Sequence, residues 1–97
     1  METNVKQIFV LSKDTICGSN SLAASEDRQK LHVCMKNEIN AYLTDRFGDR
    51  DSKANLEDEY VQEMFQSVDR ISPEQNSWTD EDDEFPVTFS IEAVEII

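Results

Sequence analysis

The two ends of this chain carry apolar patterns that are typical of β-strands. Residues 6–12 read Lys-Gln-Ile-Phe-Val-Leu-Ser, an apolar run of strand length. Residues 87–91 alternate apolar and polar side chains, and we expect that strand to continue towards Ile97. Residues 13–24 are small and polar, which predicts a loop, with a short second strand near Thr15 as an option.

The first central segment has the periodicity of an α-helix. Ser25 is predicted to cap its N-terminus, ahead of two acidic residues that favour the positive end of the helix dipole. The helix is expected to run to Phe47 and to stop at Gly48. Five side chains fall on one face at 100° per residue: Leu31, Met35, Ile39, Tyr42 and Leu43.

A second helix is predicted after the turn around residues 49–53. Ser52 or Asn55 would cap it, with Asp58 at the third position after Asn55. Glu59 and Glu63 form a like-charge i,i+4 pair that no lysine relieves. The expected apolar face consists of Leu56, Tyr60, Val61, Met64, Phe65, Val68 and Ile71, and the opposite face carries Asp58, Glu59, Glu63 and Asp69.

The order of elements predicts one α+β domain over residues 1–97. A short helical turn is expected near Ser72 and Pro73, ahead of the acidic connection to the last strand. The terminal strands would pair in an antiparallel sheet with both helices packed on one face, in the order β-α-α-β. The option of an extra short strand leaves this small two-layer arrangement unchanged.

The charge of the chain is segregated in its second half. Residues 1–50 contain seven Lys/Arg and seven Asp/Glu, so their charges cancel. Residues 51–97 contain only Lys53 and Arg70 against fourteen acids, and they carry the whole formal net charge of −12. One-sided acidity produces a directional field and favours a partner with a concentrated basic surface. Such surfaces are most often built to bind nucleic acid.

Catalytic chemistry has little support in the sequence. The one histidine, His32, projects onto the apolar side of the first helix, where packing is the ordinary role. Gly18 and Gly48 are the only glycines, which excludes a glycine-rich phosphate loop. Asp80, Asp82 and Glu84 match the first ligand positions of an EF-hand, but Phe85 stands where the loop needs glycine. We therefore expect no enzyme activity, cofactor or built metal site.

Two further features concern the cellular compartment. Cys17 and Cys34 lack both CxxC and zinc-ligand spacing, and we expect them to be reduced and buried. The N-terminus has no basic start and apolar run of a secretion signal, and no apolar stretch approaches about 20 residues. These features predict a cytoplasmic protein that does not bind membranes.

Five consecutive acids at residues 80–84 lie between two aromatic residues, Trp78 and Phe85. Such a run is often a solvated loop without further function. Here it lies between a predicted turn and a strand, and aromatic residues beside a charge cluster are typical of interface anchors. Both interpretations remain open at this point.

The whole chain resembles the small acidic phage proteins that inhibit CRISPR systems as DNA mimics, in particular type I-F anti-CRISPR proteins. The likeness rests on the length of 97 residues, the opening Met1-Glu2-Thr3-Asn4-Val5-Lys6-Gln7-Ile8-Phe9 and the acidic C-terminal half. The resemblance implies that the partner is the type I-F RNA-guided surveillance complex. The inhibitor would occupy the Lys/Arg-lined duplex site of that complex, with its acids standing in for phosphates.

The expected interface follows the acids of the second half. On this hypothesis the protein is a monomer that does not itself bind nucleic acid. Two other functions remain open: a DNA-mimic inhibitor of another basic protein, such as a restriction enzyme, repressor or nucleoid protein, and an acidic accessory subunit that neutralises a basic cytosolic partner. The candidate partner-binding residues are Glu57, Asp58, Glu59, Glu63, Asp69, Trp78, Asp80, Glu81, Asp82, Asp83, Glu84, Phe85, Glu92 and Glu95.

Overall fold

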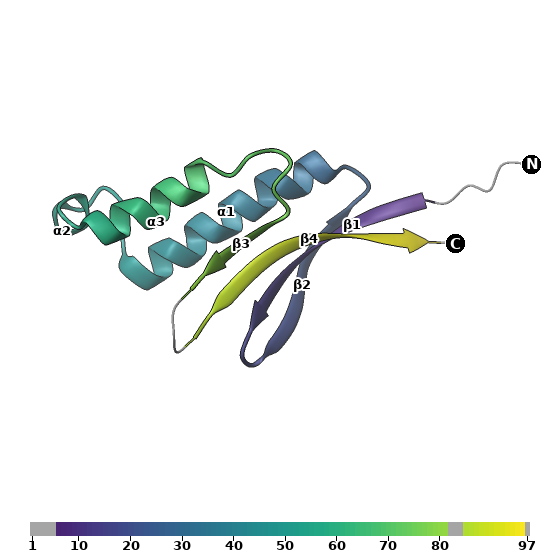
Figure 1. The fold of residues 1–97 in the computed structure, drawn as a ribbon, viewed down its shortest axis with the longest axis horizontal. Coiled ribbons are helices and arrows are strands. Elements are labelled where there is room, and N and C mark those ends of the chain that lie inside the picture. The colour runs from purple at the N-terminus through teal and green to yellow at the C-terminus, as the bar shows by residue number, and fades with distance from the viewer. Residues whose placement is uncertain (1–5, 82–84, 97) are drawn as a thin grey trace, which may run out of the picture.

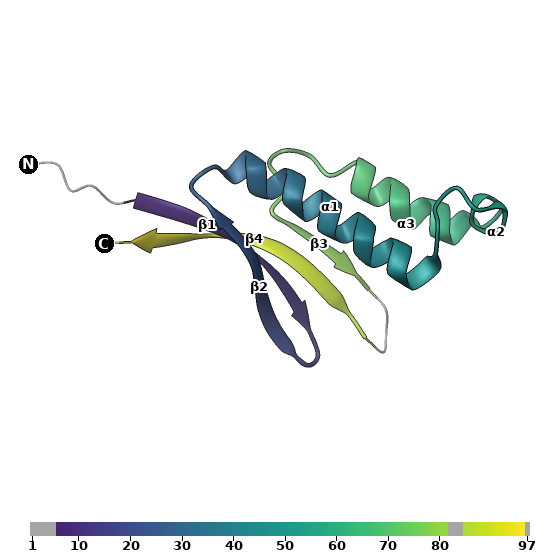
Figure 2. The same cartoon turned by 180° about the vertical axis from the view of Figure 1, so that it is seen from behind.

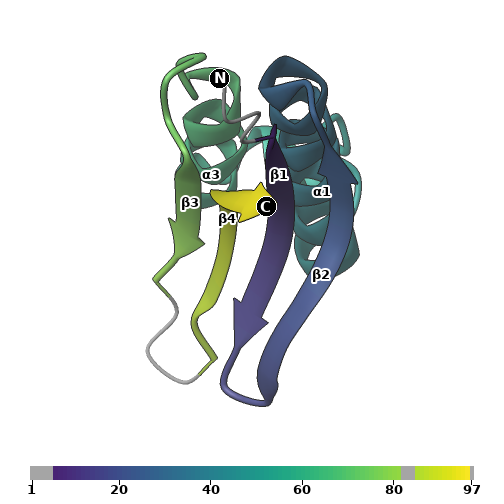
Figure 3. The same cartoon turned by 90° about the vertical axis from the view of Figure 1, so that its right-hand side faces the viewer.

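A four-stranded antiparallel sheet and a layer of helices make up the protein in a computed structural model that describes residues 6–81 and 85–96 (Figure 1). The strand order is β2-β1-β4-β3. Both long helices lie on one face of the sheet, α3 behind β3 and β4, and α1 behind β1 and β2 (Figure 3). The elements are β1 (Lys6–Thr15), β2 (Gly18–Ser25), α1 (Arg28–Phe47), α2 (Lys53–Leu56), α3 (Glu59–Asp69), β3 (Ser77–Asp80) and β4 (Val87–Ile96).

The terminal strands β1 and β4 pair with each other, as the sequence predicts, and they form the centre of the sheet. Their antiparallel register places Leu11 opposite Ile91 and Phe9 opposite Ala93. Because successive side chains of a strand point to opposite faces, Leu11, Phe89 and Ile91 all face the helices and are buried. The expected α+β class, with helices on one face of the sheet, is confirmed.

The region between β1 and α1 differs from the prediction. Thr15 ends β1, and the chain turns at Ile16 and Cys17 into an eight-residue strand, so the expected loop and short strand near Thr15 are wrong. Gly18 begins β2 with φ +128°, a conformation that other residues rarely adopt. Cys17 is exposed at this turn, against our expectation, whereas Cys34 is half-buried against the core.

Helix α1 supplies the centre of the core. Four of the five residues of its predicted apolar face, Leu31, Met35, Ile39 and Leu43, are at most 2% exposed, and the fifth, Tyr42, is half-buried against the core. Because Ser25 is the last residue of β2, the cap falls on Asp27, whose side chain accepts a hydrogen bond from the Gln29 amide. The helix ends at Gly48, as predicted, with φ +87°.

The predicted second helix is in fact two helices. Ser52 caps the four-residue α2, and Asp58, in an extended conformation, caps α3 by accepting hydrogen bonds from the Tyr60 and Val61 amides. A side chain that caps a new helix competes with continuation of the preceding one, which explains the break. The apolar face is also narrower than predicted, because Leu56 and Tyr60 are 58% and 54% exposed.

Two features before β4 were also missed. Residues 72–75 form a single turn, in which the Gln75 amide donates to the Ser72 carbonyl, instead of a helical turn. The following four residues form β3, which pairs with β4 from Ser77 opposite Ser90 to Asp80 opposite Val87. Because β2 pairs with β1 only as far as Phe9, and β3 pairs with β4 only as far as Ser90, the start of β1 and the end of β4 pair with each other alone. They extend past the helices as a two-stranded ribbon (Figure 2).

The side chain of Asn55 fixes the loop between α1 and α2. Its amide donates hydrogen bonds to the carbonyl oxygens of Phe47 (3.0 Å) and Asp49 (2.7 Å). We expect Asn55→Ala to lower the free energy of unfolding by about 1–3 kcal/mol, because two partly buried carbonyls lose their donor. Urea unfolding measures this, with exposed Lys53→Ala as the control. Equal effects of the two substitutions on the free energy of unfolding would contradict the role of the Asn55 side chain in fixing the loop.

Candidate partner-binding site

Helix α1 holds the segment that leads into β3. The Arg28 guanidinium donates to the Asn76 side chain, with an Nε to Oδ1 distance of 3.0 Å, and also to the Pro73 carbonyl. One turn further along α1, His32 Nε2 lies 2.7 Å from the Ser72 carbonyl oxygen. The first part of α1 therefore fixes the loop between α3 and β3.

The far end of β3 is held by a buried carboxylate. Asp80 is 1% exposed, and its Oδ2 accepts hydrogen bonds from the Tyr42 hydroxyl (2.6 Å) and from the Arg46 guanidinium, which also forms an ion pair with it. The other oxygen, Oδ1, is buried without a hydrogen-bond partner among the described residues. Asp80, the first residue of the acidic run at residues 80–84, is therefore buried inside the fold, although the sequence gives no sign that it differs from the rest of the run.

Trp78 is also part of the fold, since it is 6% exposed. Its indole Nε1 donates to Ser67 Oγ (2.9 Å), which in turn donates to the Met64 carbonyl (2.6 Å). The Trp78 ring also lies 6.3 Å from that of Tyr42 and 6.3 Å from that of Phe89, centroid to centroid. These contacts fix the distance between β3 and α3.

A pocket of about 380 Å³ opens between α3 and β3. It brings α3 together with Asp80 and Glu81, the first two residues of the acidic run, although these segments are apart in sequence. No basic side chain is found among the described residues that line it. The lining includes Tyr60, Glu63 and Met64 from α3, and Trp78, Asp80 and Glu81 from β3 and its end.

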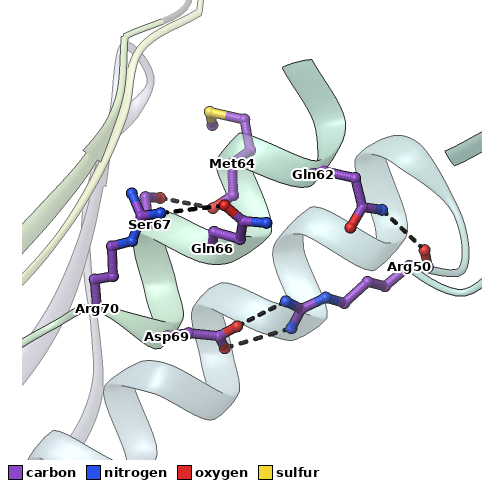
Figure 4. Close-up of polar contacts among 7 residues, drawn as sticks. All are labelled: Arg50, Gln62, Met64, Gln66, Ser67, Asp69 and Arg70. Atoms are coloured by element: carbon purple, nitrogen blue, oxygen red, sulfur yellow. Dashed lines mark hydrogen bonds and ion pairs between the residues drawn. The ribbon is translucent and has the colours of Figure 1, made fainter. Parts of the chain in front are cut away.

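Some of the other acids around α3 have hydrogen-bond partners within the protein, and others are exposed. Asp58 is the cap of α3, and Asp69 accepts two hydrogen bonds from Arg50, at 2.7 and 3.4 Å (Figure 4). The hydrogen bond and charge of Arg50 lower the pKa of Asp69. Glu57 and Glu59 are exposed near the start of α3. Two exposed acids, Glu63 and Glu81, thus line the pocket, and a third, Glu59, directly precedes the lining residue Tyr60.

The remaining candidate partner-binding residues either do not line the pocket or fall outside the residues that the structure describes. Asp82, Asp83 and Glu84, two of which were compared with EF-hand ligand positions, fall outside the described residues, and Phe85 is 60% exposed. Glu92 and Glu95 are exposed on β4. Because Ile91 faces the helices, the next residue, Glu92, points to the opposite face of the sheet.

Sequence reasoning missed the exposure of two apolar side chains, Leu56 and Tyr60. Both were assigned to the core face of a continuous helix. The Asp58 cap starts a new helix, so Leu56 lies in α2 and Tyr60 in the first turn of α3. Tyr60 packs edge-on against Phe47 at 6.0 Å and lines the pocket. The sequence signal for the start of α3 is Asp58, a residue type that favours the N-cap position, followed by Val61, Phe65 and Val68 at helical spacing.

The described residues contain neither a metal-binding cluster nor a membrane-spanning helix. Within residues 6–81 and 85–96, no three His, Cys, Asp or Glu side chains are grouped so that they could hold a metal ion. None of the helices in that part of the chain combines the length and apolar character that a membrane crossing requires.

Comparisons of the chain with protein-family models, with curated proteins and with solved structures find no match.

The buried carboxylate of Asp80 should matter far more for stability than its acidic neighbour. We expect Asp80→Ala to lower the free energy of unfolding by about 3 kcal/mol, because Arg46 and the Tyr42 hydroxyl both lose their acceptor. Glu81→Ala, at an exposed position, should change it by less than about 0.5 kcal/mol. Urea unfolding of both variants is the measurement, and equal losses would exclude a structural role for Asp80.

Tyr42 should make the free energy of unfolding depend on pH in the alkaline range. Burial and the hydrogen bond to Asp80 raise the pKa of Tyr42 from 10.0 to about 12. Since the folded state binds this proton more tightly, its contribution is fully present below pH 10 and is lost as the pH rises towards about 12. We expect the stability difference between the wild type and Tyr42→Phe to shrink over that interval in urea unfolding. A difference that stays constant with pH would contradict this.

Proposed function

We propose that this protein is a non-enzymatic inhibitor that binds the basic, nucleic-acid-binding surface of a partner and blocks access of duplex DNA to it. The observation that carries the proposal is the meeting of two acidic segments at one pocket, with Glu63 from α3 and Glu81 from the end of β3. The pocket lining contains no basic residue within the described part of the chain. Carboxylates presented in this way can replace phosphates on Lys and Arg side chains.

The partner that we propose is the type I-F RNA-guided surveillance complex, on the basis of the resemblance in length, opening residues and acidic half. The protein would act in the cytoplasm of the bacterial host, as a monomer, without a cofactor and without binding nucleic acid itself. Occupation of the duplex site is sufficient for inhibition, so no chemical step is required.

The proposed contact combines charge with an apolar anchor. The net charge of −12 steers association with a basic surface, and this effect weakens as salt increases. Lasting binding needs apolar area that excludes water. Tyr60, Leu56 and Phe85, each more than half exposed, are the side chains that would supply it, because Trp78 is buried.

The test is an order-of-addition experiment with purified type I-F complex and labelled target duplex. We expect the wild type to prevent DNA binding when it is added before the duplex. Glu59→Lys with Glu63→Lys should weaken inhibition by at least about tenfold, since like charges then face each other in the contact.

The matched control reverses two exposed acids of α1, Glu38→Lys with Asp45→Lys, which changes the net charge equally. The control should inhibit nearly as well as the wild type. Equal loss in both double variants would mean that net charge alone matters, which contradicts a defined acidic site. Absence of inhibition in either order of addition would reject the type I-F complex as the partner, and a low-salt pull-down from bacterial lysate would then identify which basic protein is bound.

A further inference from the structure

The strand β3 lies at one edge of the sheet, and its outer side has no neighbouring strand among the described residues (Figure 3). The Ile91 amide donates to the Asn76 carbonyl at 2.7 Å, so these two residues form a hydrogen-bonded pair of the antiparallel ladder. Such pairs alternate with pairs whose N–H and C=O groups point away from each other. Because Ser77 lies opposite Ser90, the main-chain groups of Ser77 and Thr79 point to the open edge.

Of these outward groups, those of Thr79 are open to a ligand. The carbonyl of Ser77 accepts a hydrogen bond from the side chain of Gln75 at 2.8 Å, which agrees with its outward direction. The side chain of Thr79 is engaged on the face of the sheet away from the helices, where its hydroxyl lies 2.9 Å from that of Thr88. Thr79 is exposed, and the ladder gives its N–H and C=O no partner on β4.

The pocket of about 380 Å³ lies along this open edge, because Thr79 is one of its lining residues. Its apolar surface comes from Tyr60 and Met64 on α3 and from Trp78 on β3. Trp78 faces the helices, so a strand placed beside β3 would direct every second side chain to the same face, towards the pocket. An open strand edge beside a pocket is a recurrent site for extended peptides, since the main chain provides affinity and the pocket selects a side chain.

The charge of the lining indicates the flanking residues of such a peptide. Glu63 on α3 and Glu81 at the end of β3 are exposed, and the described lining contains no basic side chain. Side chains two positions apart in a strand share a face, so the residues on either side of the one in the pocket would lie near these acids. Basic side chains complement them.

We propose that an extended segment of the partner adds to the sheet as a fifth strand, paired with the main chain of Thr79. It places an apolar side chain in the pocket, with a Lys or Arg two positions away on each side. The basic residues rest on the proposed function, which supplies a basic partner, whereas the open edge and the apolar pocket do not depend on it. Strand addition fixes the orientation of the inhibitor on its partner, which net charge alone does not.

The probe is the peptide acetyl-Lys-Thr-Leu-Thr-Lys-amide, in which the leucine and both lysines share one face of a strand. Binding is followed by the NMR signal of the indole N–H of Trp78, the only tryptophan of the chain. We expect saturable binding at about millimolar concentration, since five residues lack the rest of an interface.

Hydrogen exchange in the same complex tests the strand geometry. The Thr79 amide should exchange with solvent at least about fivefold more slowly when the peptide is bound, because it gains an acceptor. The main-chain amide of Trp78 already points to β4 and should change by less than about twofold. A shift of the Trp78 indole signal without protection of the Thr79 amide would overturn strand addition.

Methylated peptides test the main-chain pairing on the wild-type protein. N-methylation of both threonines removes the N–H donors that face β3 and should weaken binding by at least about tenfold. N-methylation of the leucine, whose N–H points away from β3, is the control and should change binding by less than about threefold. Equal losses in the two peptides would overturn pairing through the main chain.

A proline on β3 tests the same contact from the side of the protein. Thr79→Pro removes the outward N–H and leaves the ladder intact, because an edge strand tolerates proline where the N–H points away from its neighbour. Thr79→Val is the matched control, since it keeps the N–H and also loses the hydroxyl contact with Thr88. Thr79→Pro should bind the peptide at least about tenfold more weakly than Thr79→Val. Equal binding would overturn the role of Thr79, and if Thr79→Pro fails to fold, the methylated peptides decide the outcome.

Charge variants test the position of the basic side chains. Glu63→Gln with Glu81→Gln should weaken binding of the peptide by about fivefold. The control, Glu92→Gln with Glu95→Gln, removes the same charge from exposed positions on β4 and should change binding by less than about twofold. Equal effects of the two pairs would overturn the assignment of basic residues beside the pocket.

The two Thr79 variants, assayed against the type I-F complex, distinguish failure of this proposal from failure of the proposed function. If the wild type blocks DNA binding and Thr79→Pro blocks it as well as Thr79→Val, strand addition is overturned and the proposed function stands. If the peptide binds and protects the Thr79 amide but the complex is not inhibited, the proposed partner is wrong and the strand-addition site stands.

Discussion

The position of β3 against α1 is the constraint on which the rest of the site depends. β3 pairs with its neighbour over only four residues, so the ladder alone would hold it weakly. Helix α1 compensates at both ends, through Arg28 on Asn76 at the start and through Tyr42 and Arg46 on the buried Asp80 at the end. With β3 fixed in this way, Trp78 reaches Ser67 on α3, and the pocket between the two elements has a defined shape.

The sequence predicts those features that follow from local periodicity. The face of α1 formed by Leu31, Met35 and Ile39 follows directly from helical spacing, and the pairing of β1 with β4 follows from two strand patterns that need a common sheet. The break at Asp58 could not be read as easily, because an Asp inside an apolar-periodic stretch suits both the continuation of one helix and the cap of the next. Here the side chain bonds with the Tyr60 and Val61 amides decided the outcome.

The site was harder to predict because its key residues depend on tertiary contacts. Nothing in the run of five acids distinguishes Asp80 from Glu81, yet one is buried and the other exposed. The alternation of β3 determines this, since Trp78 and Asp80 both face α1 and α3. The residues of β3 belong to a segment that the sequence analysis interpreted as a polar connection. The alternation of buried and exposed side chains along β3 was therefore not part of the prediction. Tyr60 was missed for the related reason that the extent of the buried face depends on where α3 begins.

Some of the acids have partners within the protein and others are exposed, and this difference affects how the protein can select one partner. Among the candidate acids of the second half, Asp58, Asp69 and Asp80 act as a helix cap or in ion pairs, so fewer carboxylates are available to a partner than the net charge suggests. Diffuse charge accelerates encounter with any basic surface, but it does not select one partner. Selection requires groups that are fully desolvated on binding and satisfied by one geometry only. The pocket between α3 and β3 places Glu63 and Glu81, two carboxylates from separate elements, at one site, and the Trp78–Ser67 hydrogen bond fixes the spacing between those elements.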